Sequence, residues 1–69
     1  MDAAELGSLL PAQVPGLLRF AHRLTRTRAD AEDLVQETLT RAIERAASFR
    51  GESSLATWLH RIQQNLAVD

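Results

Sequence analysis

The chain has 69 residues, a formal net charge of −1 and no cysteine. A chain of this length forms one domain at most and buries only roughly 60% of the surface that its unfolded form exposes, so its stability depends on tight helix packing or on a partner. The absence of cysteine excludes a disulfide framework and a thiolate metal site, and the charge argues against a stand-alone nucleic-acid binder that relies on bulk electrostatics.

The first residues after Met1 are acidic, whereas a secretory signal peptide begins with basic residues. No apolar run approaches the ~20 residues that span a bilayer. We therefore expect a cytoplasmic protein. The sequence stops at Asp69 in the middle of a helical pattern with no capping signal, so we expect residues 1–69 to be a single domain and a fragment of a longer protein.

The hydrophobic periodicity is helical almost throughout, which predicts an all-α fold. Asp2, with Glu5 three residues later, resembles a capping box and predicts a short helix to about Leu10. Pro11 and Pro15 predict a break, because each proline lacks an N–H donor and disfavours helix in the residue before it. Pro15 is expected in the first turn of the next helix.

The second helix is expected over residues 15–26, with an apolar stripe and a separate basic stripe. Arg19, Arg23 and Arg26 recur at positions i, i+4 and i+7 and form the basic stripe. Two interpretations stay open for it, a solvated face and a contact with nucleic acid or another phosphate. His22 on the same helix is expected to be a partly buried surface histidine.

The third helix has the strongest pattern. Asp30 is expected as its N-cap, with Asp33 at the third helical position, where its charge favours the helix dipole. The apolar face is expected to comprise Leu34, Val35, Leu39, Ala42, Ile43 and Ala46. Polar residues occupy the other side, and Glu37 and Arg41 on that side form an i, i+4 pair in the favoured order.

The loop before the last helix contains Gly51, whose tolerance of positive φ suits a helix end. Ser53 or Ser54 is expected to cap the fourth helix. That helix presents Leu55, Leu59, Ile62 and Leu66 on one face, with Trp58 beside them and expected in the core. Its polar side contains side chains that can meet base edges through planar donors and acceptors, namely His60, Arg61, Gln64 and Asn65.

The sequence gives little support for a catalytic site or a metal site. His22 and His60 have no helical partner in a metal-ligand arrangement. Asp33 and Glu37 are better explained as solvated or partner-facing carboxylates than as cation ligands. Ser53 with His60 lacks a third, orienting group. We therefore expect neither an enzyme nor a cofactor.

Two segments together resemble region 2 of bacterial sigma factors, most closely the extracytoplasmic-function (ECF) group. The first runs from Asp30 to Thr38 (DAEDLVQET), and the second runs from Phe49 to Ile62 (FRGESSLATWLHRI), followed by NLAVD at the end. The resemblance covers about Leu17 to Asp69. It implies a small bundle of three to four helices that docks on RNA polymerase and recognises the promoter −10 element.

The resemblance also implies which residues make these contacts. For the coiled coil of the polymerase β′ clamp they are Asp33, Leu34, Gln36, Glu37 and Arg41. For the melted non-template strand they are a loop pocket and the polar side of the last helix, Phe49, Arg50, Gly51, Glu52, Ser53, Ser54, His60, Arg61, Gln64 and Asn65. Phe49 either closes the core or forms a wall of the pocket. An anti-sigma factor that covers the clamp-binding surface is a further implied partner.

The chain departs from the family pattern where Leu39, Ile43 and His60 stand in place of frequent aromatic residues. The region that reads the −35 element is absent, so we expect weak DNA binding by this fragment alone. Two alternatives remain. One is a sigma-like mimic that sequesters an anti-sigma factor without touching DNA. The other is a duplex-reading helix-turn-helix protein, which would need a more basic recognition helix than one bearing only Arg61.

Overall fold

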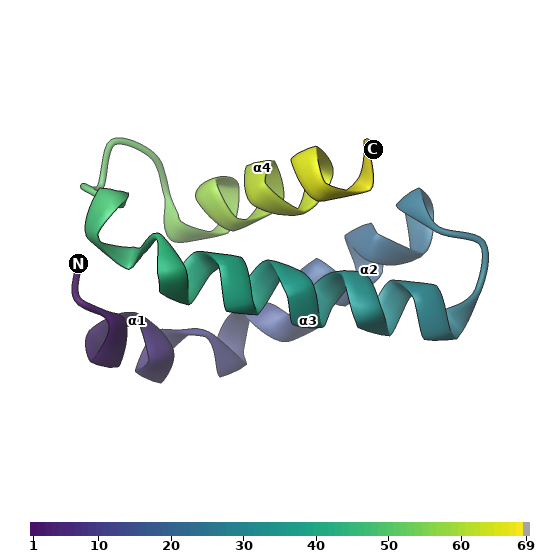
Figure 1. Ribbon diagram of the computed structural model, residues 1–69, viewed down its shortest axis with the longest axis horizontal. Helices are drawn as coiled ribbons and strands as arrows, with labels where there is room; N and C mark the ends of the chain where they lie inside the picture. Colours follow the sequence, from purple (N-terminus) through teal and green to yellow (C-terminus); the bar gives the residue numbers. More distant parts are fainter. Residues whose placement is uncertain (69) are drawn as a thin grey trace.

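The computed structural model describes residues 1–68, and within them the chain is helical with no strand. The order of elements is α1 (Ala3–Leu9), the 3₁₀ turn η1 (Pro11–Gln13), α2 (Val14–Leu24), α3 (Arg28–Glu44), the 3₁₀ turn η2 (Ala46–Ser48) and α4 (Leu55–Ala67). The long α3 runs opposite to α2 and α4 and packs against both (Figure 1). The expected all-α bundle is confirmed.

Helix α1 begins as the sequence predicts, and α2 begins at Val14, one residue earlier than expected. The Asp2 carboxylate accepts a hydrogen bond of 2.7 Å from the Glu5 N–H and caps α1. The prolines do not bend a continuous helix; they set off the turn η1, and Pro15 lies in the first turn of α2. Helix α2 ends at Leu24, two residues earlier than expected, because Thr25 adopts an extended conformation.

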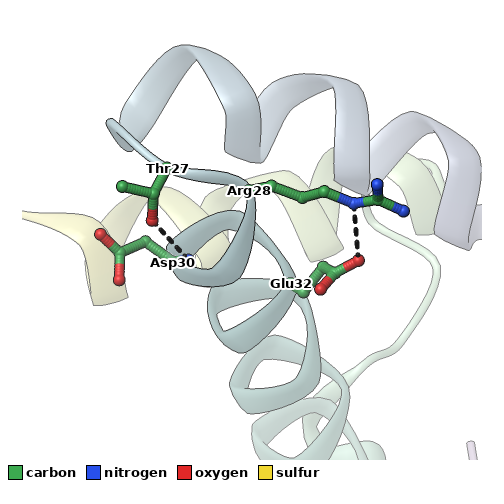
Figure 2. Close-up of polar contacts among 4 residues, drawn as sticks. All are labelled: Thr27, Arg28, Asp30 and Glu32. Carbon is green, nitrogen blue, oxygen red and sulfur yellow. Dashed lines mark hydrogen bonds and ion pairs between the residues drawn. The ribbon is translucent and has the colours of Figure 1, made fainter.

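The start of α3 differs from the prediction (Figure 2). Thr27, not Asp30, is the N-cap, and its hydroxyl accepts a 3.0 Å hydrogen bond from the Asp30 N–H. Asp30 is therefore the third helical residue, where its charge favours the helix dipole. Arg28 and Glu32 form an ion pair of 3.3 Å one turn along. The helix starts earlier for a simple reason. Thr27 and Asp30 are three residues apart, the spacing of an N-cap and the third residue of a helix, so a start at Thr27 adds a turn in which the Thr27 hydroxyl satisfies the Asp30 N–H.

The loop before α4 follows the prediction closely. Gly51 has a φ of 77°, the left-handed conformation that favours glycine. Of the two candidate caps, Ser54 is used: its Oγ accepts a 3.1 Å hydrogen bond from the Thr57 N–H. The loop therefore enters α4 with a defined direction.

The core lies where the apolar faces of α1, α2, α3 and α4 meet, around Leu6, Leu17, Leu34, Val35, Ala42, Leu59 and Ile62. Leu39, Leu55, Trp58 and Leu66 pack at its edge. Ile43 is the exception in the predicted apolar face, since it remains 37% exposed. It lies over Gly7 of the short α1, which is too small to cover it.

Gln63 of α4 is a buried polar residue with no exposed surface. Its amide Nε2 donates a 2.9 Å hydrogen bond to the Leu17 carbonyl of α2. Its Oε1 lies 3.4 Å from the hydroxyl of Thr38 on α3, and that hydroxyl also bonds the Leu34 carbonyl at 2.7 Å. One side chain thus links α4 to both of the other long helices.

Candidate functional site

One candidate surface is the α3 polar face, defined here as Asp33, Gln36, Glu37 and Arg41. The first three are exposed, and Arg41 is half-buried. Arg41 pairs with Glu37 at 3.8 Å and with Glu44 at 3.5 Å, which confirms the predicted i, i+4 pair. Such surface pairs are worth a few tenths of a kcal/mol each, so they orient the side chains more than they stabilise the fold.

Leu34 is also among the clamp contacts that the resemblance implies. It is only 8% exposed and belongs to the core, so its main role is to hold α3 against the bundle. An apolar groove of about 360 Å³ lies beside the α3 polar face, between α2 and α3. Its apolar lining is Val14, Leu18, Val35 and Leu39, with Glu32 and Gln36 at its polar side.

The loop of residues 49–54 is a second candidate surface. Phe49 is 9% exposed and packs on Trp58 with ring centroids 5.0 Å apart, so its side chain closes the core. The Phe49 carbonyl accepts a 3.1 Å hydrogen bond from the amino group of Met1. Arg50, Gly51, Glu52 and Ser54 are exposed, and Ser53 is half-buried.

The polar side of α4 carries the remaining predicted contacts. Arg61, Gln64 and Asn65 are exposed, whereas His60 is half-buried. The His60 Nδ1 lies 2.6 Å from the Ala56 carbonyl. Because a carbonyl only accepts, Nδ1 carries the hydrogen in this contact. The His60 ring also packs against an aromatic side chain. Its centroid lies 5.0 Å from the ring centroid of Phe20 on α2.

A basic groove connects α4 to α2. It has a volume of about 320 Å³ and is lined by Gly16, Arg19, Phe20, Arg23 and His60. The sequence showed the basic stripe of α2 and the polar side of α4 separately, and nothing in their spacing indicated that the two would meet. Arg26, the third member of the stripe, lies beyond the end of α2 and does not line the groove.

The structure brings together no metal or catalytic constellation within residues 1–68. No group of three His, Asp or Glu side chains there is placed to hold a metal ion. The Ser53 hydroxyl bonds the Ser54 carbonyl at 3.2 Å, and the His60 contact is also to a backbone carbonyl. Neither bond joins these two residues as a nucleophile and base.

Comparisons with known proteins agree with this helical architecture. A model of the sigma-70 region 2 family matches residues 12–69. The chain belongs to this family. A sigma factor region is not an enzyme, which agrees with the expectation from the sequence. The comparison with solved structures found no match.

This region 2 domain resembles sigma factors of the ECF group. It is 57% identical over 52 residues to the ECF RNA polymerase sigma factor SigG of Mycobacterium tuberculosis, a match covering 75% of the chain and 14% of SigG. It is 47% identical over 55 residues to EcfG of Rhodopseudomonas palustris, covering 80% of the chain and 30% of EcfG. A third relative, the ECF sigma-E factor of Haemophilus influenzae, is 47% identical over 51 residues, covering 71% and 27%. The matched segment thus covers less than a third of the length of each of these relatives.

The described part of the region 2 domain contains no helix that combines the length and the apolar character needed to cross a membrane.

Proposed function

We propose that this chain is the promoter-recognition domain of an alternative sigma factor. In this proposal it docks on the β′ clamp of RNA polymerase and recognises and melts the promoter −10 element, capturing one unstacked base of the non-template strand. The observation that carries the proposal is a separation of charge: α3 presents carboxylates to solvent, whereas α2 and α4 contain no Asp or Glu. Such a molecule can hold a protein partner and a nucleic acid on different faces.

The protein partner is assigned to the α3 polar face. The exposed carboxylates of Asp33 and Glu37 favour a basic partner surface. The neighbouring apolar groove supplies desolvated contact area that charges alone do not give. Together these features suit the side of a partner helix, such as one strand of a coiled coil.

The nucleic acid is assigned to the polar side of α4 and the preceding loop. Arg61, Gln64 and Asn65 are exposed and offer planar donors and acceptors for base edges. The exposed Arg50, Gly51 and Glu52 lie in the loop that leads into α4. The loop is held at one end by the bond from the Met1 amino group to the Phe49 carbonyl and at the other end by the Ser54 cap. A held loop with exposed backbone groups suits an unstacked base, which is recognised through hydrogen bonds to its Watson–Crick edge.

We further propose that an anti-sigma factor regulates the domain in the bacterial cytoplasm by covering the α3 polar face. A surface shaped for the polymerase can be occupied by a competing protein of similar chemistry. The alternative function is the sigma-like mimic, which would need the α3 polar face alone. The exposed Arg61, Gln64 and Asn65 favour a promoter-binding protein, because a mimic does not need base readers.

The test of this function is a titration with a single-stranded DNA library randomised over the −10 region, at low salt and near physiological salt. We expect selected sequences whose binding survives added salt and is lost in Asn65→Ala. Thr40→Ala, which truncates an exposed polar residue of α3, is the matched control and should bind normally. Binding without sequence preference that disappears as salt rises would support the mimic instead.

A further inference from the structure

The basic groove between α2 and α4 contains two arginines with no compensating charge. Arg19 and Arg23 are exposed, lie one helical turn apart and line the groove. Among residues 1–68, the only arginines within 4.0 Å of a carboxylate are Arg28 and Arg41, both on α3. Like charges at this spacing repel each other, so an anion bound between them would relieve that repulsion.

Two aromatic rings of fixed orientation also line the groove. Phe20 and His60 pack with ring planes 45° apart. The contact between His60 Nδ1 and the Ala56 carbonyl holds the imidazole in place on α4. Aromatic surfaces beside basic side chains are the usual combination in sites for single-stranded nucleic acid, where sugars and bases pack and phosphates pair.

From these features we propose that the basic groove binds the phosphodiester backbone of the single DNA strand, with Arg19 and Arg23 as phosphate ligands and the Phe20–His60 pair as the packing surface. The proposal rests on the proposed function and extends the DNA-binding surface from α4 onto α2. It assigns affinity to the groove and leaves base selectivity to α4, since phosphate contacts carry no sequence information directly.

The shape of the groove favours a strand over a small ligand. Small-molecule sites of roughly 300–1,000 Å³ enclose most of their ligand, whereas this groove of about 320 Å³ is open to solvent. Four helical residues rise about 6 Å, so the two guanidinium groups can reach different phosphates of one strand. His60 lies in the groove and Gln64 lies one turn further along α4, so a strand leaving the groove meets the base-reading side chains.

The experiment compares the chain with the double variant Arg19→Gln/Arg23→Gln. The probe is a fluorescent single-stranded DNA carrying the sequence selected by the chain, alongside a scrambled strand, with affinities measured from about 50 to about 200 mM salt. Arg45→Gln removes one positive charge outside the groove and is the control for loss of charge as such, because Arg45 is exposed at the end of α3. Circular dichroism verifies that each variant is folded.

We expect the double variant to bind both strands about tenfold more weakly at low salt, the size of two solvent-exposed charge contacts. The slope of log affinity against log salt should fall by roughly 1.4, because each single-strand phosphate contact contributes about 0.7. The ratio of selected to scrambled binding should not change. Arg45→Gln should leave the slope as it is.

Two results would overturn the groove assignment while leaving the proposed function intact. One is that the unmodified chain binds selectively and that the double variant has the same affinity for DNA, and the same dependence of affinity on salt, as the control variant. The other is a double variant that binds DNA normally and binds the polymerase core more weakly, which would make the groove a protein site. If the unmodified chain shows no selectivity, the proposed function fails first, and that outcome is recognised before any variant is measured.

Discussion

The two exposed faces of this domain differ in how their charges are arranged. On α3 the arginine of the polar face, Arg41, is paired with Glu37 and Glu44. On α2 and α4 the arginines have no carboxylate on either helix to pair with. The first face thus presents a partly neutralised pattern with excess carboxylate, and the second presents unopposed positive charge.

This difference shows that the net charge of a small domain does not describe its individual faces. The total of −1 argued against nucleic-acid binding by bulk electrostatics. Carboxylates are nevertheless absent from α2 and α4, and local fields act over about 10 Å at moderate salt. A face of one sign is therefore available to a nucleic acid even when the sum is close to zero.

The largest expected effect comes from removing Gln63, the buried side chain that links the helices carrying the two faces. Gln63→Ala removes the bonds to α2 and α3 and leaves a cavity, so the free energy of unfolding should fall by about 2–3 kcal/mol. The midpoint of thermal unfolding should fall by at least about 8 °C. Gln64→Ala, the exposed neighbour, should stay within about 0.5 kcal/mol. Equal stabilities of the two variants would contradict the role given to Gln63.

A charge reversal on one face should separate the two partners. Glu37→Arg should weaken binding to the polymerase core by about tenfold, because it places a positive charge where a basic partner surface is proposed. Binding to selected single-stranded DNA should hardly change. Glu5→Arg on α1 applies the same charge change outside the α3 polar face and serves as the control. Equal losses of polymerase binding in both variants would refute a specific role for α3.

The cap that starts α3 gives a smaller, purely structural effect. Thr27→Ala removes the hydroxyl that accepts the Asp30 N–H and should cost about 1 kcal/mol of stability. Asp30→Ala should cost less, because that side chain contributes only through the helix dipole. Urea unfolding of both variants checks the order. A larger loss in Asp30→Ala would restore Asp30 as the cap.

A change of similar or smaller size is expected in the loop of residues 49–54, which precedes α4. Gly51→Ala has open space around the added Cβ, so its cost is the left-handed backbone alone, about 1 kcal/mol. Gly51→Asn should cost less, since asparagine tolerates this conformation better. Thermal unfolding compares the two. If both variants are as stable as the unmodified chain, the loop does not depend on the positive φ.

Much of the fold was predictable because its signals are local. The Asp2 and Ser54 caps, the glycine at position 51, the Glu37–Arg41 pair and the apolar faces of the helices all involve residues within four positions of one another. The error at the start of α3 was local too. Two good capping residues, Thr27 and Asp30, compete there, and the outcome depends on which turn the helix gains.

Among the candidate site residues, the sequence identified the exposed ones better than the buried ones. Asp33, Gln36 and Glu37 on α3 and Arg61, Gln64 and Asn65 on α4 are all exposed. Leu34 and Phe49 are core residues. The sequence had placed Leu34 both on the apolar face and among the clamp contacts, and had left Phe49 open between the core and a pocket wall. Gln63 gave no signal at all, since a glutamine in a helix is ordinarily solvated.

The sequence by itself determined the helices, the caps at Asp2 and Ser54, the absence of carboxylates from α2 and α4, and the family to which the chain belongs. Only the tertiary structure decided that Arg19 and Arg23 of α2 share a groove with His60 of α4, and that Gln63 links three helices. The physical reason is how far apart in the sequence the contacting residues lie. Helix signals arise from contacts between residues a turn apart, whereas a groove requires side chains some 40 positions apart to meet, and the packing of the core alone sets that register.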